Sequence, residues 1–274
     1  MGWTLVHFLW QGTVIAIMFA AVQGLMGKRL TARGRYALAC VALAAMTAAP
    51  LVTFLAAGSA AAGDLPTRLW RISGDKVLPW IVVAWLAGVL AFSARLIGGW
   101  RFTARLRSAA VEPVPFDWQR ALEDLARRMR VSAPVRLLNS SLAAAPAVVG
   151  WLRPAILMPV EALMGLPIEH VRALLAHELA HIRRHDYLVN ILQSVAEAAL
   201  FYQPAVWWVS DQIRAAREAC CDDLAVEASG DALIYVTVLA DLDARRRTSL
   251  RTALAADGGT LVSRIRRLLG EPQR

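Results

Sequence analysis

The sequence is poor in charged residues, and those it has are unevenly placed. Only 19% of the 274 residues are charged, 57% are hydrophobic, and the mean hydropathy is +0.46. This composition excludes an intrinsically disordered chain, because disordered segments are rich in charge and poor in apolar residues. Asp, Glu, Lys and Arg are missing altogether from residues 1–27, 36–63 and 77–94. The apolar excess is therefore concentrated in the first part of the chain.

Cysteine is also scarce. The chain has three cysteines, Cys40, Cys220 and Cys221, and two of them are neighbours in sequence, which rarely pair with each other. A disulfide framework is thus excluded, and the composition fits a reducing cytoplasm. Cys40, inside the second apolar stretch, is expected to act as a small apolar residue.

The three charge-free stretches are long enough to cross a membrane as helices. The hydrocarbon core of a bilayer is about 30 Å thick and needs about 20 apolar helical residues. We predict transmembrane helices at about 3–26, 36–57 and 77–97. The chain then divides into a transmembrane region, residues 1–100, and a mostly soluble domain, residues 101–274.

The basic residues predict the orientation of these helices. The loop at residues 28–35 has four basic residues and no acidic one, whereas the loop at 58–76 mixes both signs. Because basic loops stay in the cytoplasm, we predict a multi-pass protein of the cell (inner) membrane, with its N-terminus outside and its catalytic domain inside. A cleaved signal peptide is disfavoured, because such peptides carry basic residues ahead of the apolar run and none precedes Lys28.

The net charge of +9 does not by itself indicate nucleic-acid binding. Much of the positive charge flanks the apolar stretches, where it suits a membrane surface. Two further basic groups, residues 245–247 and 264–267, fit anionic lipid at least as well as nucleic acid. We expect the lipid bilayer as a partner and no direct nucleic-acid binding.

Beyond residue 100 the pattern predicts an α+β domain. An amphipathic helix is expected at about 116–130 and a strong helix at 167–187, started by a proline. Between them, the runs VRLLN, AAAPAVVGWL and PAILMP predict short strands. Residues 188–210 are apolar, but Glu197 divides them and Pro204 would kink them. We interpret them as a core helix packed beside the 167–187 helix rather than as a membrane span.

The candidate metal-binding and catalytic residues lie in the run ALLAHELAHIRRHD, within the second predicted helix. His177 and His181 are four residues apart, so they project from one face of a helix, the spacing at which two imidazoles bind one metal ion. Glu178 follows the first histidine, where it can act as a general base on a water molecule activated by the metal. The alternative is a helix with two surface histidines and an acid that bind nothing.

A catalytic zinc site needs a third protein ligand. His185 continues the spacing of four, but on a straight helix it would lie about 12 Å from His177 and could not share its metal. The signature HExxHxxGxxH also fails, because Arg184 occupies the glycine position and Tyr187 that of the last histidine.

Glu218 is a better candidate for the third ligand. It lies in the predicted helical run RAAREACCDDLAV, with Asp222 four residues later on the same face. An acid there can accept the free N–H of a ligand histidine and raise its basicity. The alternative is a solvated helix face with charge pairs.

Several motifs together resemble a known family. The segments are HELAHIRRHDYLVN, QPAVWW, REACCDD, the upstream APAVVGWLRPAILMP and the late SRIRRLL. They resemble the bacterial membrane metallopeptidases of the BlaR/MecR type, which are antibiotic-sensing signal transducers and their relatives. The resemblance covers about residues 3–269. In the sensors, a further span and an extracellular sensor domain follow. After Val209 the longest apolar stretch here is short, so we do not expect that span in this sequence.

The resemblance implies a gluzincin-like zinc peptidase on the cytoplasmic side of the membrane. Carried over to this sequence, it makes His177, His181 and Glu218 the zinc ligands, Glu178 the general base and Asp222 a supporting acid beside the ligands. A protein or peptide is the expected substrate, bound as an added strand at residues 144–150. The expected role is signalling through cleavage of the protein itself or of a DNA-binding repressor.

Two other functions are compatible with the sequence. A housekeeping metalloprotease for membrane-protein quality control also carries HExxH and a later glutamate. A membrane scaffold would use the site only to bind a partner. Glu178 argues against the scaffold, because zinc binding alone does not need that base.

Overall fold

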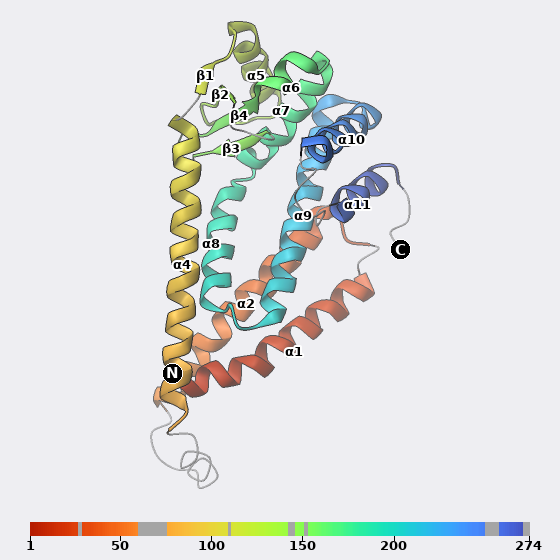
Figure 1. The fold of residues 1–274 in the computed structure, drawn as a ribbon. Helices are drawn as coiled ribbons and strands as arrows, with labels where there is room; N and C mark the ends of the chain where they lie inside the picture. The colour runs from red at the N-terminus through yellow and green to blue at the C-terminus, as the bar shows by residue number, and fades with distance from the viewer. Residues whose placement is uncertain are drawn as a thin grey trace. The chain divides into compact units, whose positions relative to one another are not determined.

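A computed structural model describes residues 1–26, 29–59, 76–108, 111–141, 146–150, 153–249 and 258–270. The chain forms two compact units. The first joins Met1–Gly98 to Asn190–Arg217, and the second joins Gly99–Val189 to Glu218–Arg274. Each unit therefore contains segments that are far apart in sequence (Figure 1).

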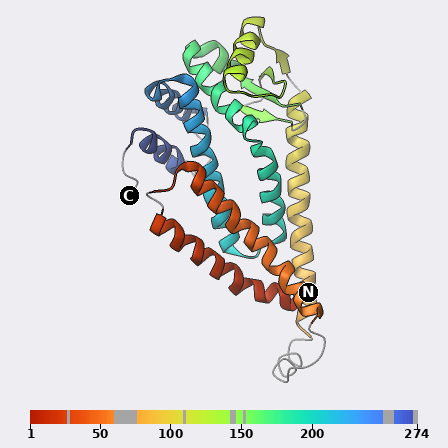
Figure 2. The ribbon, with the colours of Figure 1, turned by 180° about the vertical axis from the view of Figure 1, so that it is seen from behind.

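The first unit is helical. It contains α1 (Gly2–Met26), α2 (Ala32–Ser59), most of α4 (Leu78–Ser108), most of α8 (Asp186–Ala199) and the first half of α9 (Pro204–Ser229). By length and composition, α1, α2 and α4 could each cross a membrane, over Gly2–Met26, Ala32–Ala56 and Leu78–Arg105. These ranges contain nearly all of the spans predicted from the sequence. α1 packs on α2 (Figure 2). Between these helices the Gln11 amide donates to Thr53 Oγ1 at 2.9 Å.

The second unit is built on a four-stranded sheet. Its strands are β1 (Val111–Pro113), β2 (Arg136–Ser140), β3 (Ala147–Val149) and β4 (Ala155–Pro159), in the order β1-β2-β4-β3. β2 and β4 are parallel, with Leu138 opposite Leu157, and the outer strands are antiparallel to them. β2, β3 and β4 lie in segments expected to form strands, whereas β1 was not expected.

In the described part of the chain, five whole helices belong to this unit, together with parts of α4, α8 and α9. They are α5 (Phe116–Arg128), α6 (Val160–Gly165), α7 (Ile168–Arg183), α10 (Ala232–Ser249) and α11 (Gly258–Leu268). α7 lies at the centre, in contact with α5 and α10. Leu175 and Leu179 of α7 are fully buried with Leu122 of α5 and Ile156 of β4. This core holds α7 in place from several sides.

The helix predicted at 167–187 ends earlier than expected. α7 stops at Arg183, and His185 takes a left-handed backbone conformation (φ +54°) before α8 begins at Asp186. Left-handed residues commonly end helices, but glycine usually provides them, so the sequence holds no clear signal here.

The interpretation of residues 188–210 as a core helix beside α7 is wrong. The segment forms two helices joined by a short turn, and Asn190–Arg217 belongs to the first unit. Pro204 does not kink a helix but begins α9, because proline lacks the N–H that an interior position would need.

Candidate metal centre

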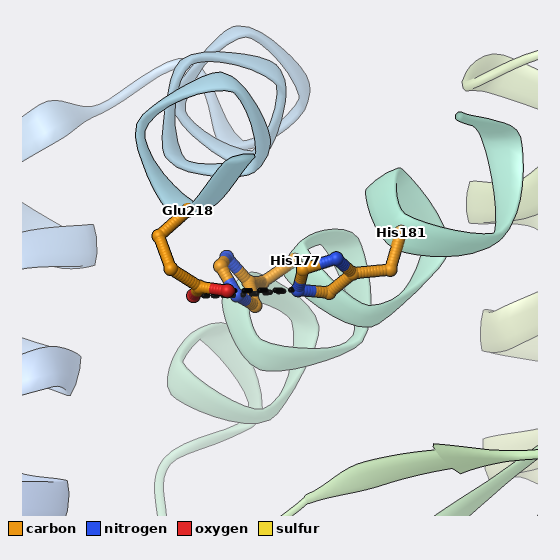
Figure 3. A group of neighbouring side chains, drawn as sticks. All are labelled: His177, His181 and Glu218. Atoms are coloured by element: carbon orange, nitrogen blue, oxygen red, sulfur yellow. Dashed lines mark hydrogen bonds and ion pairs between the residues drawn. The ribbon is translucent and has the colours of Figure 1, made fainter. Parts of the chain in front are cut away.

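Helix α7 presents both motif histidines on one side. Leu175 and Leu179 point into the core, so the residues one turn apart at His177 and His181 face away from it, half-buried. Their Nε2 atoms lie 3.2 Å apart, with the two rings nearly perpendicular (Figure 3).

Helix α9 brings Glu218 to the same point. Its Oε2 lies 3.4 Å from His177 Nε2 and its Oε1 3.8 Å from His181 Nε2 (Figure 3). The three donor atoms all lie within 4.8 Å of one another. The structure thus collects the three residues that the sequence predicts as ligands.

The donor set suits a metal ion such as zinc. Two imidazole nitrogens and a carboxylate oxygen are typical ligands of catalytic zinc. Donors about 2.0–2.2 Å from a tetrahedral zinc ion would lie about 3.3–3.6 Å apart. The separation of 3.2 Å between the two Nε2 atoms is close to this range, and so are the separations of 3.4 and 3.8 Å from the two histidines to different oxygens of the Glu218 carboxylate.

The Nδ1 nitrogen of His177 contacts Tyr235, a residue that was not predicted from the sequence. Tyr235 donates its hydroxyl proton to Asp222 Oδ1 at 2.7 Å, and its oxygen lies 2.8 Å from His177 Nδ1. His177 therefore carries its proton on Nδ1 and leaves the Nε2 lone pair free. Asp222, 3.5 Å from the same nitrogen, acts on this ring mainly through Tyr235.

The far nitrogen of His181 is held by Asp186, at 2.9 Å from Nδ1 to Oδ2. Burial opposes the charged form of His181, but the Asp186 hydrogen bond and nearby carboxylates outweigh it, so its pKa is raised. Cys221 Sγ lies 3.3 Å from both Nδ1 and Asp186 Oδ2. Burial, with the charge of Asp186, raises the pKa of this thiol, which stays protonated and donates to the carboxylate. Asp186 and Cys221 therefore hold the His181 ring at its Nδ1 nitrogen.

Helix α11 contributes two arginines, Arg264 and Arg267, that pair with carboxylates of α9 near the candidate ligands. Arg264 binds both oxygens of the buried Asp222, at 2.6 and 3.0 Å, and its Nη1 lies 3.6 Å from Glu218 Oε2. Arg267 binds Asp223 at 2.5 Å. These two members of the basic group at 264–267 thus form ion pairs within the second unit, which the lipid or nucleic-acid interpretation did not anticipate.

These charges decide the state of Glu218. Burial raises the pKa of this carboxyl group, but the hydrogen bond and charge of His177, with His181 and Arg264, outweigh burial and lower its pKa to about 2. Glu218 is therefore ionised at neutral pH, as a metal ligand must be.

The remaining predicted residues lie as follows. Glu178 is half-buried beside His177, and burial is the main reason that its pKa is raised. His185 is exposed and belongs to neither potential metal-binding group in the described residues. Of the segment expected to bind substrate, residues 144 and 145 lie outside the described residues, and Ala147–Val149 forms the outer strand β3.

Comparison with known proteins places these observations in a family. Residues 3–265 match the family described as BlaR1 peptidase M56. The chain is also similar to the regulatory protein BlaR1 of Bacillus licheniformis, with 30% identity over 94 residues. That match covers 34% of this chain and only 16% of BlaR1.

Proposed function

Because this chain belongs to the BlaR1 peptidase M56 family, we propose that it is a membrane-embedded zinc endopeptidase of the gluzincin type. Its catalytic domain faces the cytoplasm, and it works in signalling by cleaving itself or a transcriptional repressor. The observation that carries the proposal is the convergence of His177, His181 and Glu218 on one point beside Glu178.

His177, His181 and Glu218 would hold the zinc ion. Zinc in such a site lowers the pKa of a water molecule and polarises a carbonyl group. Tyr235 and Asp186 keep both histidines in the tautomer that leaves Nε2 free for a metal. Arg264 stabilises the ionised forms of Asp222 and Glu218.

Glu178 acts as the general base. Its carboxylate accepts a proton from the attacking water, while the water oxygen forms a bond to the scissile carbonyl carbon. Glu178 then gives this proton to the amide nitrogen, which leaves as an amine when the C–N bond breaks. The outer strand β3 offers backbone groups to which an extended peptide substrate can add as a further strand.

The test of catalysis compares two variants. Glu178→Gln keeps the size of the side chain and all three ligands, but an amide cannot accept the proton. Metal content should stay near that of the wild type, whereas cleavage should fall by about 10²- to 10⁴-fold. His177→Ala should lose both metal and cleavage. If Glu178→Gln restores the phenotype of a gene deletion and His177→Ala does not, the metal is structural and the peptidase proposal is wrong.

The proposed orientation has its own test. A reporter fused after residue 65 should report the outside, and one fused after residue 110 should report the cytoplasm. Fusions that report the same compartment would contradict the placement of α4 across the membrane.

A further inference from the structure

The hairpin formed by α8 and the first half of α9, residues 186–217, is not among the helices that could cross a membrane by length and composition. We propose that this hairpin is nevertheless embedded in the bilayer, entering from the side on which α1 ends and turning back inside the apolar layer. This inference rests on the proposed membrane location of α1 and α4.

The first argument is the depth at which α9 meets α1. Gln203, just before α9, contacts Leu9 (2.7 Å); farther along, Trp208 contacts Phe19 (ring centroids 5.3 Å) and Gln212 contacts Gln23 (3.2 Å). The residue numbers rise together, so α9 runs in the same direction as α1 and contacts it at points between Leu9 and Gln23. If α1 crosses the membrane, the start of α9 passes through the same layer.

The second argument is the position of the turn. Trp85 of α4 donates its indole N–H to the carbonyl of Ala199 at 2.8 Å, and Phe92 stacks on Phe201 at 5.3 Å. Gly88 lies between them in α4, and a Cβ there would overlap the Phe201 ring. All three positions on α4 fall inside its charge-free stretch, residues 77–94. The turn is therefore level with the apolar part of α4, well past its first residues.

The third argument is that polar groups of the hairpin find hydrogen-bond or ion-pair partners within the protein. In lipid, each backbone N–H and C=O needs a partner within the protein. At the turn, the carbonyls of Ala199 and Phe201 accept from the indoles of Trp85 and Trp207. Glu197 is the only charged residue in 187–210, and it pairs with Arg214 at 2.7 Å.

The same inward arrangement holds for Gln193, near the middle of α8. The buried Gln193 donates to the carbonyl of Ser210 at 3.0 Å and to Glu197 at 3.1 Å, which links the two helices of the hairpin. Polar side chains within membrane proteins face the interior in this way.

The outer face of α8 is apolar and exposed. It carries four large side chains at helical spacing, namely Leu188, Ile191, Leu192 and Val195. Val195 is 58% exposed and lies two residues after Gln193, which bonds to the Ser210 carbonyl of α9. Such a stripe is costly in water and favourable in lipid.

The length of α8 explains why the hairpin turns back. Fourteen residues span about 21 Å, less than the hydrocarbon core of about 30 Å. A helix as short as α8 can enter the bilayer but does not cross it. The hairpin also leads directly into the metal centre, because α8 begins at Asp186 and α9 continues to Glu218.

The experiment measures what surrounds Val195. The full chain, with Cys40→Ala to remove the half-buried native thiol, receives Val195→Cys, a nitroxide label and reconstitution into phosphatidylcholine–phosphatidylglycerol vesicles. Power-saturation EPR then compares collisions with oxygen, which concentrates in lipid, and with a water-soluble nickel chelate. Ile17→Cys on α1, 62% exposed, is the lipid control, and Leu233→Cys on α10, 66% exposed, is the water control. The Cys40→Ala parent measures any label on Cys220 and Cys221.

We expect a several-fold preference for oxygen at positions 195 and 17, and a preference for nickel at 233. Ile191→Cys provides a second reading of the same face if Val195→Cys does not retain its metal. Nickel access at 195 with oxygen preference at 17 would overturn the inference and leave the three spans intact. Low access to both reagents at 195 would also overturn it, because protein and not lipid would cover α8. Nickel access at both 195 and 17 would instead reject the membrane location of α1, and with it the proposed function's membrane setting.

Discussion

The long apolar helices of the first unit and the core of the second unit place their large apolar side chains differently. In the first unit, large apolar residues such as Ile17, Leu55 and Leu90 are exposed. In the second, residues of the same kind, such as Leu122 and Leu175, are fully buried around α7. Water drives apolar groups inward, whereas lipid gives them no such drive. The difference indicates that the two units are built for different surroundings.

The polar side chains also have different roles in the two units. In the first unit they join helices, as Gln11 does with Thr53 and Gln203 with the Leu9 carbonyl. Hydrogen bonds and close packing are the forces that remain between helices in lipid. In the second unit, His177, His181 and Glu218 instead gather at the candidate metal centre, beside a buried apolar core. The following predictions test this contrast, from the largest expected effect to the smallest.

The largest effect is expected at the metal centre itself. Glu218→Ala removes one of three ligands, so the metal affinity of the purified protein should fall by more than the roughly 10- to 100-fold typical of losing a supporting residue. His185→Ala should leave metal content unchanged, because His185 is exposed and outside the site. The opposite pattern in metal analysis would move the third ligand to His185. Membrane insertion should be unaffected in both variants, since the first unit does not contain Glu218.

One substitution at two sites compares the units directly. Leu175→Ala leaves a cavity in a fully buried core and should lower the free energy of unfolding by about 2–5 kcal/mol. Leu90→Ala removes the same atoms from a side chain of α4 that is 69% exposed. This substitution should change the free energy of unfolding by less than about 0.5 kcal/mol. Denaturation in detergent micelles measures both values. Equal losses would mean that Leu90 is covered by another part of the protein.

A smaller effect is expected from the hydroxyl that holds His177. Tyr235→Phe keeps the buried ring but removes the partner of His177 Nδ1, so metal affinity should fall by about 10- to 100-fold. Tyr187→Phe, next to the exposed His185, is the matched control and should bind metal as the wild type does. A chelator competition assay measures both affinities. Unchanged affinity in Tyr235→Phe would show that Asp222 holds the histidine without the tyrosine.

Features that depend on neighbouring residues could be predicted from the sequence. His177 and His181 share a face because a helix has 3.6 residues per turn, and that period is independent of the rest of the fold. The three apolar stretches predict their helices for a similar reason, since length and composition are local properties. The end of α7 was missed because His185 adopts a conformation that histidine seldom takes without support from its surroundings.

The sequence by itself determined the helix that carries the two histidines, the three long apolar helices and the candidate third ligand. Only the tertiary structure decided that Tyr235 and Arg264 stand behind that site, and that the α8–α9 hairpin joins the N-terminal helices. These partners are separated by tens of residues or more, and no local periodicity relates such distant positions. Their meeting depends on how whole helices pack, and packing is set by the summed burial of side chains over the entire unit.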